Sequence, residues 1–155
     1  MANFVYNQGK FLLANGSLNL ISDTIKLLLV ANSYEGSNTV AFLADANTVH
    51  DIVSHVITSA TVSGYAHVAL TSRTVSETDD GGSSNGFAFF NAANVTFSTL
   101  GTGHTVGGCG LFREGANNTA SPLIAFYEGV DTPTNGGDIT IQFANTVNGG
   151  VLKLA

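Results

Sequence analysis

The chain is built from short apolar runs separated by polar turns, and this pattern limits the folds that it can adopt. From residue 58 onward the runs recur about every ten residues. The clearest run covers residues 138–143, where Ile139, Ile141 and Phe143 alternate with polar residues and share one face of a strand. No strands alternate with long helical segments, which argues against a doubly wound sheet. The pattern predicts a mainly β fold, a β-sandwich or jelly-roll-like arrangement of antiparallel sheets.

The expected strands follow from the same runs. A buried strand is predicted at 24–31, with Lys26 near its open end. Polar loops are expected at 32–39, 77–85 and 117–122. The remaining strands are predicted at 66–71 (extended by 73–75), 86–90, 94–98, 104–113, 123–127, 138–143 and 151–154.

Helical structure is predicted mainly near the N-terminus. Residues 7–15 form the best helix candidate, with Phe11 and Leu12 packed inward and Gly16 at the C-cap. One or two short helical turns are expected within 40–46 and 49–57. The 155 residues can bury a real core. We expect a single β-rich domain over 1–155, with an N-terminal helix or arm, residues 1–20, packed on it.

The composition is poor in charge. Charged residues make up 10% of the chain, against roughly 25% in an ordinary soluble domain. The polar surface must therefore consist of Asn, Thr, Ser and Gly, which suits turn-rich β structure and subunits buried in an assembly. The formal net charge is −6 and the five cations are dispersed, which disfavours nucleic acid and anionic membrane surfaces as partners. No apolar run approaches a membrane span, and no signal peptide is recognisable, so synthesis in a cytosol is expected.

The glycine-rich stretch GTGHTVGGCG at 101–110 raises three possibilities: a phosphate loop, a reactive thiol or a closely packed strand. A dinucleotide fingerprint fails because Val106 stands where the third glycine belongs, and a Walker loop fails for lack of a lysine. His104 and Cys109 are five residues apart and point to opposite faces of a strand, so Cys109 is expected to be a small buried apolar residue.

Close packing is the interpretation that remains for this stretch. One face of the predicted strand carries Val106, Gly108, Gly110 and Phe112, and the other carries Thr105, Gly107, Cys109, Leu111 and Arg113. Glycine inside a strand marks a bulge or the approach of another backbone. Gly107, Gly108 and Gly110 are therefore predicted packing positions, either between two sheets or across a subunit interface.

Catalytic and metal-binding patterns are missing from the sequence. The histidines at 50, 55, 67 and 104 have no zinc spacing, and no nucleophile-elbow motif occurs. The segment 79–82 (DDGG) lacks the alternating oxygen ligands of a calcium loop; a loose Ca²⁺ at an interface is the alternative to a solvated loop. We expect no enzyme activity, no cofactor and no metal.

Several segments resemble a family of small virion proteins of tailed bacteriophages. The resemblance covers most of the chain, and 35–90 fits it less well. Matching segments downstream are 94–97, 110–113, 121–125, 139–143 and the turn at 148–149. The matching N-terminal positions are Tyr6, Asn7, Lys10, Gly16, Asp23, Thr24, Ile25, Lys26 and Tyr34.

The resemblance implies a β-rich accessory subunit of the virion, with no catalytic signature. The preferred role is a capsid decoration (cement) protein, made in the host bacterial cytoplasm and bound to the major capsid protein on the capsid surface as a homotrimer. The N-terminal segment is then a reasonable arm for the capsid, which makes Phe4 and Tyr6 candidate interface or packing residues. The alternative is a tail or fibre-associated module that recognises a host surface glycan through loops such as 77–85.

Overall fold

A computed structural model describes residues 3–34, 45–78, 86–143 and 150–154. The chain is mainly β, with antiparallel sheets and one α-helix in the described residues, so the predicted fold class is confirmed. The finer choice between a sandwich and a jelly roll stays a prediction. The expected helical turn at 40–46 lies largely outside the described residues, as does the loop at 77–85.

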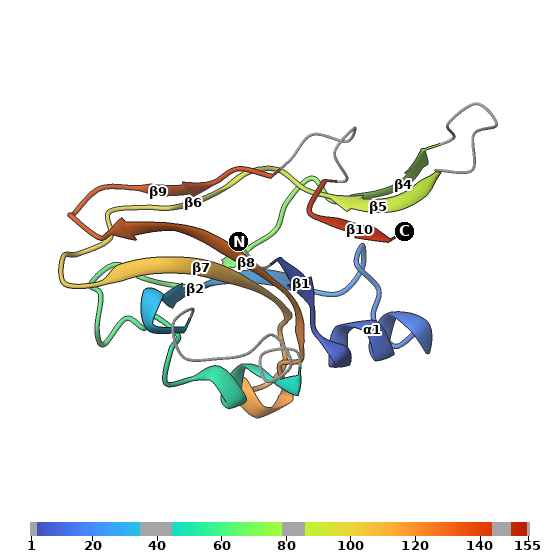
Figure 1. Cartoon of the computed structure of the whole chain (residues 1–155), viewed down its shortest axis with the longest axis horizontal. Coiled ribbons are helices and arrows are strands. Elements are labelled where there is room, and N and C mark those ends of the chain that lie inside the picture. Colours follow the sequence, from blue (N-terminus) through green and yellow to red (C-terminus); the bar gives the residue numbers. More distant parts are fainter. Residues whose placement is uncertain (1–2, 35–44, 79–85, 144–149, 155) are drawn as a thin grey trace.

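The largest sheet has five strands, and we call it the large sheet (Figure 1). Its strand order is β1-β8-β7-β2-β3, and every neighbouring pair is antiparallel. The sequence alone did not predict its first strand, which is only two residues long. The strands are β1 (Phe4–Val5), β8 (Leu123–Pro133), β7 (Thr105–Arg113), β2 (Ile25–Ala31) and β3 (Val68–Ala69).

Two smaller sheets lie together on one side of the large sheet (Figure 1). One has three strands in the order β10-β5-β4, and the other pairs β6 with β9. Each pairing is again antiparallel. The strands are β10 (Leu152–Leu154), β5 (Phe87–Asn91), β4 (Thr74–Thr78), β6 (Val95–Phe97) and β9 (Ile139–Ile141).

The helices lie on the opposite side of the large sheet (Figure 1). They are α1 (Asn7–Ala14) and the short 3-10 helices η1 (Asn32–Tyr34), η2 (Val49–Ile52) and η3 (Asn118–Ala120). The helical turn predicted within 49–57 is thus η2, and a capping box between Thr48 and Asp51 fixes its start.

The end of α1 follows the prediction, but its buried face does not. Gly16 has a φ of 74°, and its N–H and that of Ser17 bond back to Leu13 and Leu12, which closes the helix as a Schellman motif. Leu12 is buried as expected, whereas Phe11 is 60% exposed. The helix packs on β8 through Gly9, where a Cβ would lie 2.5 Å from the carbonyl oxygen of Ile124. This contact turns Phe11 outward.

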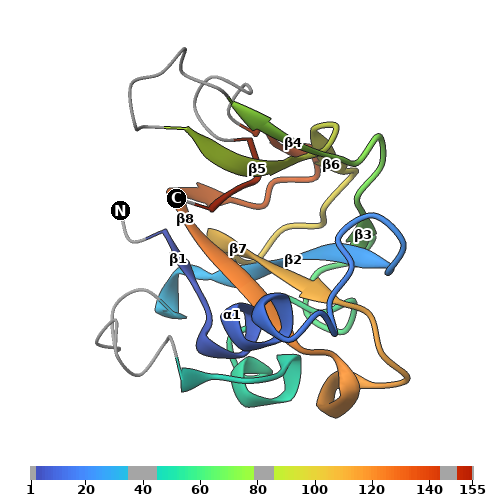
Figure 2. The same cartoon turned by 90° about the vertical axis from the view of Figure 1, so that its right-hand side faces the viewer.

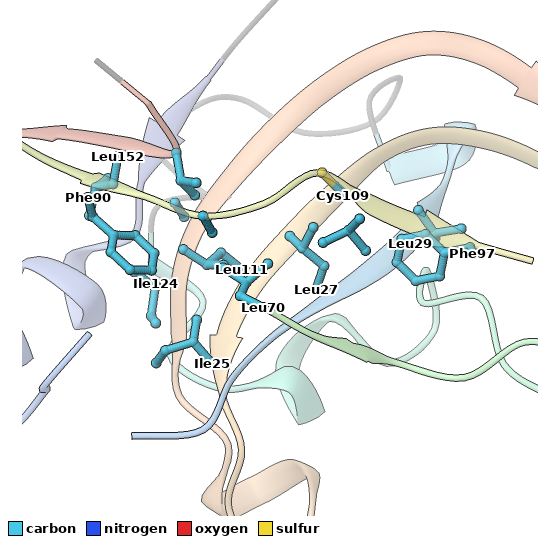
Figure 3. Packing of buried hydrophobic residues seen from close by; sticks show 14 of the residues in the cluster. Ile25, Leu27, Leu29, Leu70, Phe90, Phe97, Cys109, Leu111, Ile124 and Leu152 are labelled. Atoms are coloured by element: carbon cyan, nitrogen blue, oxygen red, sulfur yellow. The ribbon is translucent and has the colours of Figure 1, made fainter. Parts of the chain in front are cut away.

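Two hydrophobic cores cover the two faces of the large sheet. Residues of β2 alternate between them, which explains why its run of apolar residues is continuous. Figure 3 shows part of the core between the large sheet and the smaller sheets, which we call the inter-sheet core; Leu27, Leu111 and Phe90 belong to it. The helix-side core contains Tyr6, Leu28, Val30, Tyr34, Val49, Ile52, Val56, Phe112, Leu123 and Phe126.

A bulge interrupts the alternation predicted for β7. Ala31 pairs with Val106 and Val30 with Gly108, so Gly107 is the extra residue. The bulge turns Val106 into the inter-sheet core beside Cys109. The prediction that Val106 shares a face with Gly108 and Gly110 is therefore wrong, because a one-residue insertion reverses every side chain beyond it.

Candidate functional site

Phe4 and Tyr6, two of the residues singled out from the sequence, lie together on the helix side of the large sheet. Phe126 of β8 lies at the centre, with ring centroids 5.5 Å from Phe4 and 5.1 Å from Tyr34. Tyr6 packs edge-on against Phe4 at 5.0 Å, and His55 lies 5.2 Å from Tyr34. We call these five residues the aromatic cluster. It joins segments that are far apart in the sequence.

Glycine at position 108 makes room for the ring of Phe126 in this cluster, and glycine at position 110 makes room for Leu28. A Cβ on Gly108 would lie 2.6 Å from the carbonyl oxygen of Tyr127 and 2.9 Å from the ring of Phe126. A Cβ on Gly110 would lie 3.0 Å from Leu28 Cδ1. The close approach at these two positions is thus made by residues of the same chain, and Gly107 occupies the bulge.

The cluster holds a buried pair of tyrosine hydroxyls. The Oη atoms of Tyr6 and Tyr34 are 3.0 Å apart, and both side chains are almost inaccessible to solvent. Burial is the main cause that raises the pKa of each phenol above its ordinary value. Both stay protonated at physiological pH, so the pair serves as a structural bond.

The N-terminal segment is built into the sheet. Phe4 pairs with Phe126, and the N–H of Tyr6 donates to the carbonyl oxygen of Ile124 at 2.9 Å. The side chain of Asn3 accepts a hydrogen bond from the N–H of Glu128 at 3.1 Å. Tyr6 is fully buried and acts as a packing residue, while Phe4 is only partly exposed.

A polar cleft of about 420 Å³ opens beside the aromatic cluster and is lined by Tyr34, Asp45, Asp51, Ser54 and His55. His55 Nδ1 is buried without a hydrogen-bond partner. Asp51 accepts hydrogen bonds from the backbone N–H groups of residues 47 and 48, and the bond from residue 48 is the main cause that lowers its pKa. Its carboxylate is thus engaged in capping η2 and is not bonded to the imidazole.

A second cleft, of about 540 Å³, lies between the large sheet and strands β9 and β10. Val106, Ile139 and Phe143 supply apolar walls, and Cys109 lies at its buried side. Burial raises the pKa of the Cys109 thiol to about 12, so the thiolate is scarce near neutral pH. The prediction that Cys109 is a small buried residue is confirmed.

His67 borders a third and shallower groove, beside Tyr65 and Val56. Its ring packs edge-on against Phe112 and Tyr65. Burial is the main cause that lowers its pKa. In residues 3–34, 45–78, 86–143 and 150–154, no group of three or more His, Cys, Asp or Glu side chains could hold a metal ion.

Exposed apolar side chains form the other notable surface feature. Phe11 of α1 and Val75 of β4 are 60% and 54% exposed, and Ile21 and Val53 are also exposed. The exposed edge at β4 was not predicted; its sequence of Thr, Val, Ser, Glu and Thr has no clear apolar face, and this could have indicated an exposed strand.

No family model, curated protein or solved structure matches this chain. Among the described residues, no helix is long and apolar enough to cross a membrane. The observations that bear on function are therefore the exposed apolar side chains, the clefts and the resemblance of the sequence to small virion proteins.

Proposed function

We propose that this chain is a structural protein of a bacteriophage virion, a decoration protein that binds the assembled head shell. It acts as a homotrimer and has the major capsid protein as its partner. The sequence resemblance and the low charge support this role.

The observation that carries the proposal is the placement of Phe11. This large apolar side chain is 60% exposed, yet α1, which bears it, is held firmly at both ends. The close contact of Gly9 with β8 and the hydrogen bond from Tyr6 fix the start of the helix, and the Gly16 motif fixes its end. A rigid helix that presents a phenylalanine to solvent is suited to binding a partner's pocket, because little conformational entropy is lost on binding.

Binding of this kind stabilises a shell without any reaction. A subunit that binds only the assembled shell lowers the free energy of that state, by an amount that grows with the logarithm of its free concentration relative to its dissociation constant. The mainly Asn, Thr, Ser and Gly surface can approach neighbouring subunits with few charges to desolvate.

The test is binding to phage heads that lack the protein. Phe11→Ser should weaken binding at least tenfold in a sedimentation assay and should lower the temperature at which decorated heads break open. Val53→Ser removes another exposed apolar side chain and should bind as the wild type does. Equal binding of all three proteins, or no binding by the wild type, would contradict the proposal.

A further inference from the structure

Strand β4 is an edge of the three-stranded sheet, and no described residue pairs with its outer side. Thr74, Val75, Ser76 and Glu77 of β4 are all exposed, and the strand lies at the outer margin of its sheet in both Figure 1 and Figure 2. Native sheets usually protect such an edge with lysine, proline or a bulge. Strand β4 contains none of these.

The hydrogen bonds of β5 show which groups of β4 face outward. The carbonyl oxygen of Phe90 accepts from the N–H of Val151, so the backbone of Phe90 faces β10. Backbone direction alternates along a strand, so Phe89 and Asn91 face β4 and bond to their partners Ser76 and Thr74. Val75 and Glu77, which lie on either side of Ser76, therefore direct their N–H and C=O groups to the open edge.

We propose that this edge binds the same edge of a second copy of the chain, in an antiparallel pair centred on Ser76. Each Val75 would then exchange two hydrogen bonds with Glu77 of the other copy, and the two Ser76 residues would face each other. The result would be a continuous six-stranded sheet across a twofold axis.

The side chains of β4 fit a second copy. In this register the only charge of the strand, Glu77, lies opposite a valine rather than opposite the other Glu77. The two Val75 side chains lie on one face as diagonal neighbours, and the small Ser76 side chains meet on the other. A net charge of −6 on each copy opposes the approach, so pairing should strengthen as salt is added.

The contact is small, since a stable protein interface buries about 1,600 Å² and a pair of five-residue strands buries far less. We therefore expect weak pairing in dilute solution and strong pairing where copies are crowded together. This twofold contact is separate from the threefold contact of the proposed trimer, and it can be tested on the purified chain without a phage shell.

Disulfide trapping tests both the pairing and its register. In the proposed pair the Cα atoms of the two Ser76 residues are about 4.5 Å apart, which a disulfide can span. Ser76→Cys should give covalent dimers under mild oxidation, more of them as salt and protein concentration rise. Thr74→Cys is the matched control, because two cysteines at that position would lie about 13 Å apart along the strands. The native Cys109 is buried and should not contribute.

A proline substitution in β4 provides a second test of the pairing. Val75→Pro removes an N–H that faces the open edge and leaves the bonds to β5 intact, so the fold should tolerate it. Circular dichroism and a melting curve confirm that the variant folds. Adding Val75→Pro to Ser76→Cys should abolish the dimers, whereas Val75→Thr should keep them.

Three outcomes would overturn the proposal. One is equal trapping at positions 74 and 76, and another is trapping that survives Val75→Pro in a folded protein. The third is trapping that weakens as salt is added, since two copies that each carry a net charge of −6 should pair more strongly when their repulsion is screened.

Discussion

The hydroxyl oxygens of Tyr6 and Tyr34 lie 3.0 Å apart beneath the large sheet, and they join the start of the chain to η1. Neither residue belongs to a strand of the sheet. The bond therefore ties two peripheral segments together across the helix-side core, and several expectations about stability follow from its surroundings.

Removing one hydroxyl of this pair should destabilise the protein. Tyr6→Phe keeps the ring and loses the hydrogen bond, which should lower the free energy of unfolding by about 1–2 kcal/mol. Tyr6→Ala also leaves a cavity and should cost about 3–5 kcal/mol. Denaturant unfolding measures both. The double variant Tyr6→Phe with Tyr34→Phe should cost less than the sum of the single changes; strict additivity would show that the two hydroxyls do not interact.

Adding a methyl group at Gly108 should be costly. The new Cβ would collide with a backbone carbonyl that cannot move away, so Gly108→Ala should lower stability by about 1–3 kcal/mol, and Gly108→Val by more. Gly110→Ala should cost less, because the atom it meets is the end of the flexible Leu28 side chain.

Gly129→Ala is the matched control for these variants. A Cβ at Gly129 would have only ordinary contacts, 3.5 Å or longer, with the backbone of β7. Its unfolding midpoint should stay close to that of the wild type. If Gly108→Ala were equally stable, the packing described for β7 would be incorrect.

Acid should weaken the fold through His67. Burial, and to a lesser extent the charge of Lys26, lowers the pKa of this imidazole, while Glu114 acts in the opposite direction. Below the ordinary pKa of about 6.5, the unfolded chain takes up a proton that the folded chain resists, so stability falls as pH decreases through this range. His67→Gln should flatten the dependence of the unfolding midpoint between pH 7 and pH 5. An unchanged slope would show that His67 is not responsible.

Thiol labelling should report unfolding. Because the Cys109 thiol is buried and its pKa is about 12, an aromatic disulfide reagent at pH 8 should modify the native protein very slowly and the denatured protein at once. The Ser76→Cys variant supplies an exposed thiol as the control, and one fast equivalent per chain is expected from it. Rapid labelling of both cysteines in the native state would contradict the buried position of Cys109.

The sequence predicted most of the strands because their apolar runs are regular. The ends of strands β2, β5 and β6 lie within one to two residues of their predicted positions. Strand β1 was missed because two residues carry no periodic signal, and its pairing with β8 depends on a contact far along the chain. Strand β8 extends to Pro133, well beyond the predicted end at 127, since its second half contains polar and glycine residues.

The candidate site was predicted less well, because it is formed by contacts between residues that are far apart in the sequence. The strand pattern pointed to packing at Gly108 and Gly110, but it could not show that Phe126 and Leu28 would fill the space beside them. Both Phe11 and Leu12 were predicted to pack inward, and the contact of Gly9 with Ile124 leaves only Leu12 buried. The periodicity of a strand or helix identifies residues that must pack against something. The residues that they pack against are determined by the topology of the fold.

The pairing of β1 with β8 also affects the order in which the protein can be made. Phe4 and Val5 leave the ribosome long before their partners at residues 126 and 125, which lie about 120 residues further along the chain. Until then Tyr6 and α1 have no sheet to pack against, and contacts between such distant residues form slowly. Residues 4–14 are therefore synthesised well before the strand that they pack on, and we expect them to be among the last to reach their native positions.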